Sequence, residues 1–192
     1  MARTAIIGAA AAGVLLAGYV GAAEAAAALD CPERQGDLQL SGRSEGLCNY
    51  AGADGTVVAL RRLAAGGGSV ETTLATLKSE LKALLPAQPA NAAAPAGGKA
   101  AVNVDNGGER IAVRASGDGA AEVDVRGDRD GQVRATFILA SDQAGPAGWQ
   151  LAGYEARGPE AGPLTVATVK SRAKGRDQVF DDMRALVRRN AG

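Results

Sequence analysis

Residues 132–140, QVRATFILA, alternate polar and apolar side chains. The apolar positions lie two residues apart, at Val133, Ala135, Phe137 and Leu139. A period of two is typical of a β-strand that buries one of its faces. The sequence therefore predicts a half-buried strand over these residues.

Two further extended segments and an amphipathic helix follow this strand. Residues 149–157 and 164–169 are apolar-rich runs, and they are separated by Gly-Pro pairs that are typical of turns. The last segment carries five apolar side chains at helical spacing, with aspartates early and arginines late, which suits the helix dipole. These five are Val179, Phe180, Met183, Leu186 and Val187. This half of the chain therefore predicts the order strand, strand, strand, helix.

Residues 37–85 show the same order. Extended runs begin at Leu38, Leu47 and Thr56, and turn-forming residues lie between them. Ser69 follows a run of three glycines and can cap a helix. Apolar residues then recur at helical spacing until Pro86, at Val70, Leu74, Leu77, Leu81 and Leu84.

The sequence predicts a linker and a weak β meander between these halves. Residues 87–100 are rich in Pro, Ala and Gly and have almost no large apolar side chain, so they cannot offset the entropy of ordering. Short alternating pieces fill residues 101–131. We therefore predict an α+β fold made of two antiparallel strand-strand-strand-helix units with a short polar β meander between them. The first unit spans 26–86 and the β-rich second one 101–192; the sequence leaves open whether the two share one sheet.

The amino terminus has the pattern of a cleavable export signal. A short basic start precedes an uncharged run over residues 5–23, and the small residues Ala23 and Ala25 suit signal peptidase. We predict a signal peptide over residues 1–25 and a periplasmic or secreted mature protein. An uncleaved membrane helix is the alternative, although Ala and Gly insert weakly. A lipid anchor on Cys31 is disfavoured because an aspartate precedes it.

Cys31 and Cys48 are the only cysteines of the chain, and both follow the predicted signal. Oxidising compartments favour pairing, and closing a loop of about 18 residues stabilises a fold by ~3 kcal/mol. The alternative, a reactive thiol, needs an activating base, and the chain has no histidine. We therefore predict a structural disulfide.

The composition excludes several classes of function. Lys and Arg total 21, as do Asp and Glu, so no overall field attracts nucleic acid or an anionic membrane. Aromatic residues make up only 3%, which leaves little surface for stacking bases or sugars. Without histidine, the Ser-His, Cys-His and His-metal sites are impossible. We predict no catalytic residue, no metal site, no cofactor and no nucleic-acid partner.

Two groups of charged residues are candidate sites. Lys170, Arg172, Lys174 and Arg176 could contact an anionic envelope polymer or lipid head groups, although a solvated loop is the favoured interpretation. Four carboxylates could serve an enzyme that needs no histidine. They are Asp124, Asp128, Asp130 and Glu155. Two of them close together in one cleft would favour an enzyme, and scattered placement would favour a binding protein.

Four segments carry a family resemblance: LDCPERQGDL at 29–38, GLCNYAGADG at 46–55, VRATFILAS at 133–141 and GYEARGPEAGPLTVATVKS at 153–171. They resemble a group of uncharacterised exported or lipid-anchored alphaproteobacterial proteins. Some members of that group are labelled methyltransferases, but this sequence lacks the strand, glycine-rich turn, helix and acidic strand end of a Rossmann unit. The resemblance implies export, and it transfers neither a lipid anchor nor catalytic residues.

The sequence as a whole predicts an exported, non-enzymatic envelope protein with a binding or structural role. Its partner would be an envelope protein or an anionic polymer, and it would meet the membrane only through an uncleaved signal. Two alternatives stay open. One is a small periplasmic enzyme that uses carboxylates alone, and the other is an adhesive or polymer-contacting protein.

Overall fold

A computed structural model describes residues 28–64, 69–85, 101–105, 109–115, 121–173 and 177–191. The predicted signal peptide and linker lie outside these described residues. The strands are β1 (Arg34–Gln35), β2 (Leu38–Ser44), β3 (Leu47–Ala51), β4 (Val57–Leu63), β5 (Ala101–Asp105), β6 (Glu109–Ala115), β7 (Ala121–Arg129), β8 (Gln132–Ala140), β9 (Leu151–Pro159) and β10 (Leu164–Ser171), and the helices are α1 (Val70–Lys82) and α2 (Asp177–Asn190).

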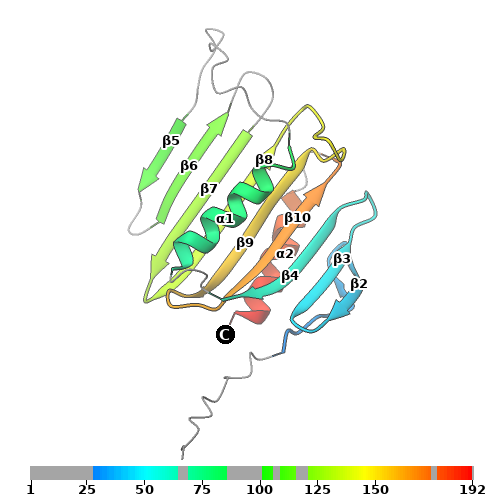
Figure 1. Ribbon diagram of the computed structural model, residues 1–192, viewed down its shortest axis with the longest axis horizontal. Coiled ribbons are helices and arrows are strands. Elements are labelled where there is room, and N and C mark those ends of the chain that lie inside the picture. The colour runs from blue at the N-terminus through cyan, green and yellow to red at the C-terminus, as the bar shows by residue number, and fades with distance from the viewer. Residues whose placement is uncertain are drawn as a thin grey trace, which may run out of the picture.

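The strands form one ten-stranded sheet in the order β1-β2-β3-β4-β10-β9-β8-β7-β6-β5 (Figure 1). Every neighbouring pair is antiparallel. Strands that follow one another in the sequence lie side by side, except at the centre, where β4 pairs with β10. At this seam Leu63 lies opposite Leu164 and Val57 lies opposite Lys170. The seam joins an amino-terminal and a carboxy-terminal meander into one continuous sheet.

Helix α1 packs on one face of the sheet, called here the front face. Ser69 caps the helix, and its Oγ accepts a hydrogen bond of 3.1 Å from the backbone N–H of Thr72. Four residues of the predicted apolar stripe are buried: Val70, Leu74, Leu77 and Leu81. They join one core cluster with Phe137 of β8, Tyr154 of β9 and Val166 of β10. The first helix of the chain therefore buries its apolar side on strands from the carboxy-terminal half.

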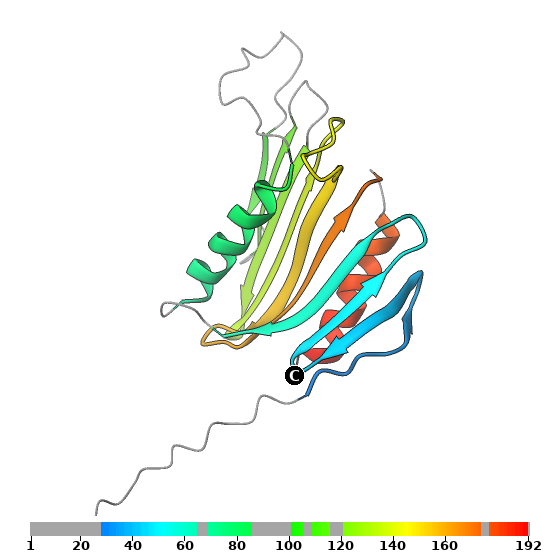
Figure 2. The same cartoon turned by 45° about the vertical axis from the view of Figure 1, so that its right-hand side comes forward.

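Helix α2 packs on the opposite face, called here the back face (Figure 2). All five predicted apolar positions of this helix are buried. They join a second core cluster with Tyr50 of β3, Val58 and Leu60 of β4, and Val169 of β10. Each large aliphatic side chain buried in this way stabilises the fold by about 1.5–3 kcal/mol. Helix α2 thus fixes the amino-terminal strands to the centre of the sheet.

Residues before β1 are tied to the fold in two ways. A disulfide links Cys31 to Cys48 of β3, with the two Cα atoms 6.0 Å apart, which confirms the predicted pairing. The Asn190 side chain at the end of α2 accepts a hydrogen bond of 2.7 Å from the Asp30 N–H and donates one of 3.0 Å to the Asp30 carbonyl. The residues that precede β1 are therefore held to both the sheet and the last helix.

The two helices cover different parts of the sheet, so each face has an area that neither helix covers. On the front face this area lies over β3 and β4, where Val57 is 37% exposed. On the back face it lies over β7 and β8, where Val123, Val125 and Thr136 are only partly buried. Both statements concern the described ranges alone. The result is one broad sheet with two separate open areas.

The mixed α+β class and the antiparallel pairing are confirmed. The division into two strand-strand-strand-helix units is not confirmed as predicted. The strands and helices occur in the predicted order, but β4 pairs directly with β10 and each helix packs partly on strands of the other half. The predicted polar meander is present as β5 to β7 and extends one edge of the same sheet.

Candidate functional site

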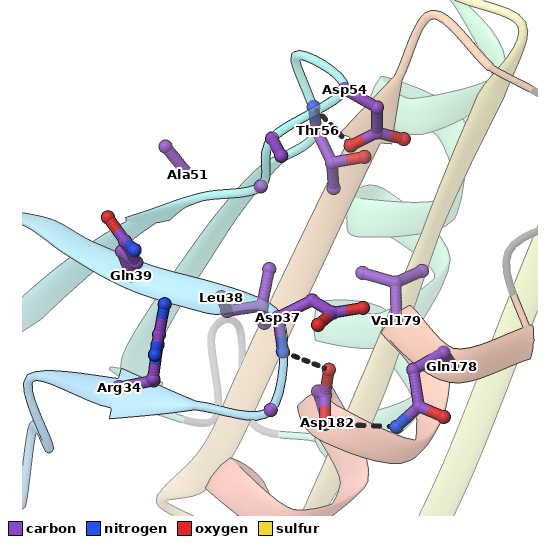
Figure 3. Close-up of a pocket in the computed structure, with 13 residues that line it drawn as sticks. Arg34, Asp37, Leu38, Gln39, Ala51, Asp54, Thr56, Gln178, Val179 and Asp182 are labelled. Atoms are coloured by element: carbon purple, nitrogen blue, oxygen red, sulfur yellow. Dashed lines mark hydrogen bonds between the residues drawn. The ribbon is translucent and has the colours of Figure 1, made fainter.

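A pocket of about 510 Å³ opens at one end of the sheet (Figure 3). Three parts of the chain that lie far apart in the sequence line it: the β1–β2 turn, the β3–β4 turn and the first turns of α2. Each part contributes one carboxylate, namely Asp37, Asp54 and Asp182. Arg34 is the one cation among the described lining residues. The pocket therefore has a surplus of negative charge.

Asp182 is the most buried of the three carboxylates, with only 4% of the residue exposed. One of its oxygens accepts a hydrogen bond of 3.2 Å from the Asp37 backbone N–H, and the other accepts one of 3.4 Å from Gln178. The carboxylate lies directly against Gly36, whose φ is +56°. Only a glycine leaves room for this approach, so Asp182 fixes the β1–β2 turn to the helix.

Asp54 and Asp37 differ in their surroundings. Asp54 accepts a hydrogen bond of 3.3 Å from the Thr56 backbone N–H and so shapes the β3–β4 turn. The Thr56 hydroxyl donates a hydrogen bond of 3.0 Å to the Ser171 hydroxyl, which ties that turn to β10. The Asp37 side chain is exposed, and Figure 3 shows it projecting between Asp54 and Asp182. Asp37 is therefore the carboxylate best placed to meet a ligand.

The carboxylates that the sequence singled out do not meet. Asp124 of β7 is registered opposite Phe137, which places it on the front face, whereas Glu155 of β9 is opposite Thr136 on the back face. Asp130 lies exposed in the β7–β8 turn with a φ of +53°. The Asp128 side chain lies outside the described part of the structure. No two of the candidates with described side chains share a cleft.

Asp124 belongs to an ion-pair network that holds α1 against β7. The Lys78 ammonium lies 2.6 Å from Asp124 and 2.9 Å from Glu122, and Lys82 lies 2.8 Å from Glu122. Burial opposes the charge of Lys78, but its hydrogen bonds to Asp124 and Glu122 outweigh that effect and raise the pKa of the amine. Burial likewise opposes ionisation of Glu122, and the bonds from Lys82 and Lys78 lower the pKa of that carboxyl. These groups serve the contact between helix and sheet.

Glu155 is buried on the back face, with only 3% of the residue exposed. The Thr136 hydroxyl donates a hydrogen bond of 2.5 Å to one carboxylate oxygen. The other oxygen lies 3.7 Å from Arg157 and 3.9 Å from Arg184. Charged and hydrogen-bonding partners therefore hold this carboxylate in place between β8, β9 and α2.

The predicted basic run is described only in part. The Lys170 ammonium lies 5.5 Å and the Arg172 guanidinium 5.4 Å from the centre of the Trp149 ring. These distances fit cation–π contacts. Lys174 and Arg176 lie outside the described residues. The structure thus brings two of the four predicted cations together on a tryptophan, a contact that no pattern in the sequence indicates.

The three pocket carboxylates could not be predicted from the sequence, because no local sequence pattern links them. Asp54 lies in a predicted turn, Asp37 directly precedes the first predicted extended run, and Asp182 is one of several aspartates near the start of a predicted helix. The three carboxylates lie far apart in the sequence, so the sequence does not indicate that the β1–β2 turn, the β3–β4 turn and α2 line one pocket. The consecutive residues Gly36 and Asp37 are the one local sequence feature that indicates a turn with special backbone geometry.

No protein-family model, curated protein or solved structure matches this chain. The resemblance to exported alphaproteobacterial proteins therefore stays a prediction. Among the described residues, no set of three or more carboxylate, cysteine or histidine groups is arranged to hold a metal ion. In the same part of the chain, neither helix is long and apolar enough to cross a membrane.

Proposed function

We propose that this protein is an exported, non-enzymatic envelope protein that binds a partner through the open areas of its sheet. The single observation that carries the proposal is the placement of α1 and α2 on opposite faces, which leaves broad surface over β3 and β4 and over β7 and β8. Small-molecule enzymes usually enclose their substrate in a deep and mostly apolar cavity. A wide, partly covered sheet is better suited to contact with a protein or a polymer.

Further features support this proposal. The disulfide between Cys31 and Cys48 suits an oxidising compartment, in agreement with a cleaved signal over residues 1–25 and a periplasmic or secreted location. Asp124 and Glu155 lie on opposite faces and are both engaged by cations of the fold. On this proposal the two strand-strand-strand-helix segments act as halves of one binding platform, and Lys170 and Arg172 offer one contact for an anionic polymer.

A carboxylate-based enzyme is the second candidate, favoured by one specific observation. Asp37, Asp54 and Asp182 line the same pocket, although Asp54 and Asp182 both hold backbone groups in place. Asp37 combines an exposed side chain with a place between the other two. An active site in this pocket would therefore depend on Asp37.

Rescue of a strain that lacks the gene separates the two candidates. Asp37→Asn, Asp124→Asn and Glu155→Gln would be introduced singly, and the abundance and folding of each variant would be measured beside the envelope phenotype. The binding proposal expects the Asp37→Asn variant to rescue fully, because a neutral amide leaves the open sheet areas intact. Loss of rescue by this well-folded variant would favour the enzyme and overturn the binding proposal.

A further inference from the structure

Four arginines lie close together on the back face, two of them beside Glu155 and the other two beside Arg157. Arg157 of β9 lies directly opposite Arg134 of β8 in the antiparallel register. Arg184 and Arg188 lie one helical turn apart on α2, and the Arg184 guanidinium is 3.9 Å from Glu155. Two strands and a helix therefore bring one basic cluster together beside the open area of the back face.

The cluster holds more positive charge than its own carboxylates balance. Arg157 is paired with Glu155 at 3.7 Å, and Arg184 is paired with Asp181 at 2.9 Å. Arg134 and Arg188 have no ion-pair partner among the residues that the structure describes. Two positive charges thus stand in excess, and both side chains are exposed to an incoming group.

This surplus of positive charge destabilises the charged form of the Arg157 guanidinium. Like charges directly opposite each other in an antiparallel pair destabilise a sheet. The Arg157 side chain is only 19% exposed, and its Nε has no hydrogen-bond acceptor in the described structure. Burial lowers the pKa of Arg157, and the nearby Arg134 and Arg188 lower it further, against the opposing effect of Glu155. An anion placed between these guanidinium groups would relieve the repulsion.

We infer that Arg134, Arg157 and Arg188 form a binding site for an oxyanion of the phosphate type. Guanidinium groups bind such anions through paired, charge-assisted hydrogen bonds, and three of them can approach one group from different sides. The site lies at the edge of the uncovered surface of β8, so the anion can be free in solution or displayed as the phosphate of a lipid head group. This inference rests on the proposed binding function and names the chemistry of its ligand.

The test compares the full mature protein with the double variant Arg134→Gln/Arg188→Gln. The loss of these two arginines removes repulsion and leaves the pairs of Glu155 and Asp181 intact. The double variant is therefore expected to unfold at the same or a higher urea concentration than the native protein. Binding of inorganic phosphate and pyrophosphate would be measured by calorimetry at constant ionic strength. Sedimentation with phosphatidylglycerol or phosphatidylcholine vesicles would test binding to the phosphate of a lipid head group.

The native protein is expected to bind the phosphates, the phosphatidylglycerol vesicles, or both, and the double variant to bind about tenfold more weakly or worse. Arg34→Gln, which removes an exposed arginine near the carboxylate pocket, is the control for loss of a surface arginine and should bind normally.

Phosphate binding alone identifies a free anion, and vesicle binding alone identifies a lipid phosphate. No binding to any probe, equal binding by the double variant, or loss of binding only in Lys170→Gln/Arg172→Gln would overturn the site. The rescue experiment can still succeed in those cases, so the two proposals fail separately.

Discussion

Gly36 shows how a single position connects the carboxylate pocket to the fold. Its φ is +56°, and a Cβ at this position would overlap a carboxylate oxygen of Asp182. We expect Gly36→Ala to lower the free energy of unfolding by about 1 kcal/mol for the backbone alone, and by clearly more because the buried carboxylate must move. Gly46→Ala is the matched control, since Gly46 has a φ of +69° and open space within 4 Å of where its Cβ would lie. Equal losses for the two variants in urea titrations would contradict this account.

Asn190 is a second residue that holds distant segments of the chain together, through hydrogen bonds. Its side chain makes two hydrogen bonds to the backbone of Asp30, and its carbonyl accepts bonds from Thr165 and Arg62. Asn190→Ala keeps the carbonyl but leaves the Asp30 groups unpaired, so we expect a loss of about 1–3 kcal/mol in the free energy of unfolding. Asn49→Ala on the front face serves as the control and should cost much less. A negligible effect of Asn190→Ala in thermal unfolding would show that the attachment of the segment before β1 contributes little.

At the scale of elements, α1 is fixed to the sheet by charge as well as by apolar packing. The lowered pKa of Glu122 means that its ion pairs stabilise the fold fully above the carboxyl's usual pKa of 4.5, and that this contribution is lost as the pH falls through the lower folded value. The raised pKa of Lys78 makes stability depend on pH in the opposite direction. Its contribution is complete below the usual 10.5 and is lost only as the pH rises through the higher folded value.

Glu122→Gln tests this account of α1. We expect it to lower the free energy of unfolding at neutral pH by about 2 kcal/mol, because Lys78 and Lys82 lose a buried carboxylate. The variant should also lose less stability than the native protein on acidification below pH 4.5. Glu71→Gln is the control at the same contact, since the Glu71 side chain is 78% exposed and its pair with Arg126 is worth little. Parallel pH profiles for the native protein and Glu122→Gln would refute the assignment.

Individual elements could be predicted from the sequence where burial imposes a period. The alternation in β8 and the apolar stripes of α1 and α2 each depend on residues within one segment, and the structure confirms all three. The placement of Arg134 beside Arg157 and the pocket of Asp37, Asp54 and Asp182 depend instead on how segments pair. Sequence periodicity specifies which face of an element is buried, but it does not specify the element against which that face packs.

At the scale of the whole molecule, the β4–β10 seam and the crossed packing of the helices make the two halves dependent on each other. The stripe of α1 is buried on β8, β9 and β10, whereas α2 buries Tyr50, Val58 and Leu60 from the amino-terminal strands. The amino-terminal half alone would expose the stripe of α1, and the carboxy-terminal half alone would expose the sheet surface that α1 covers and the part of α2 that packs on the amino-terminal strands. Each half would also expose the central edge of its sheet, and such exposed apolar surface and strand edges favour aggregation over folding.

We therefore expect residues 28–85 and 101–191 to fold only together. Each fragment alone should lack a cooperative unfolding transition, and mixing the two should restore the circular dichroism spectrum and a single transition. The control is the full chain carrying an inserted protease site between residues 86 and 100, which should stay assembled after cleavage because the seam and both cores are intact. Cooperative folding of either fragment alone would show that the halves are independent domains and that the helix contacts across the seam add little to stability.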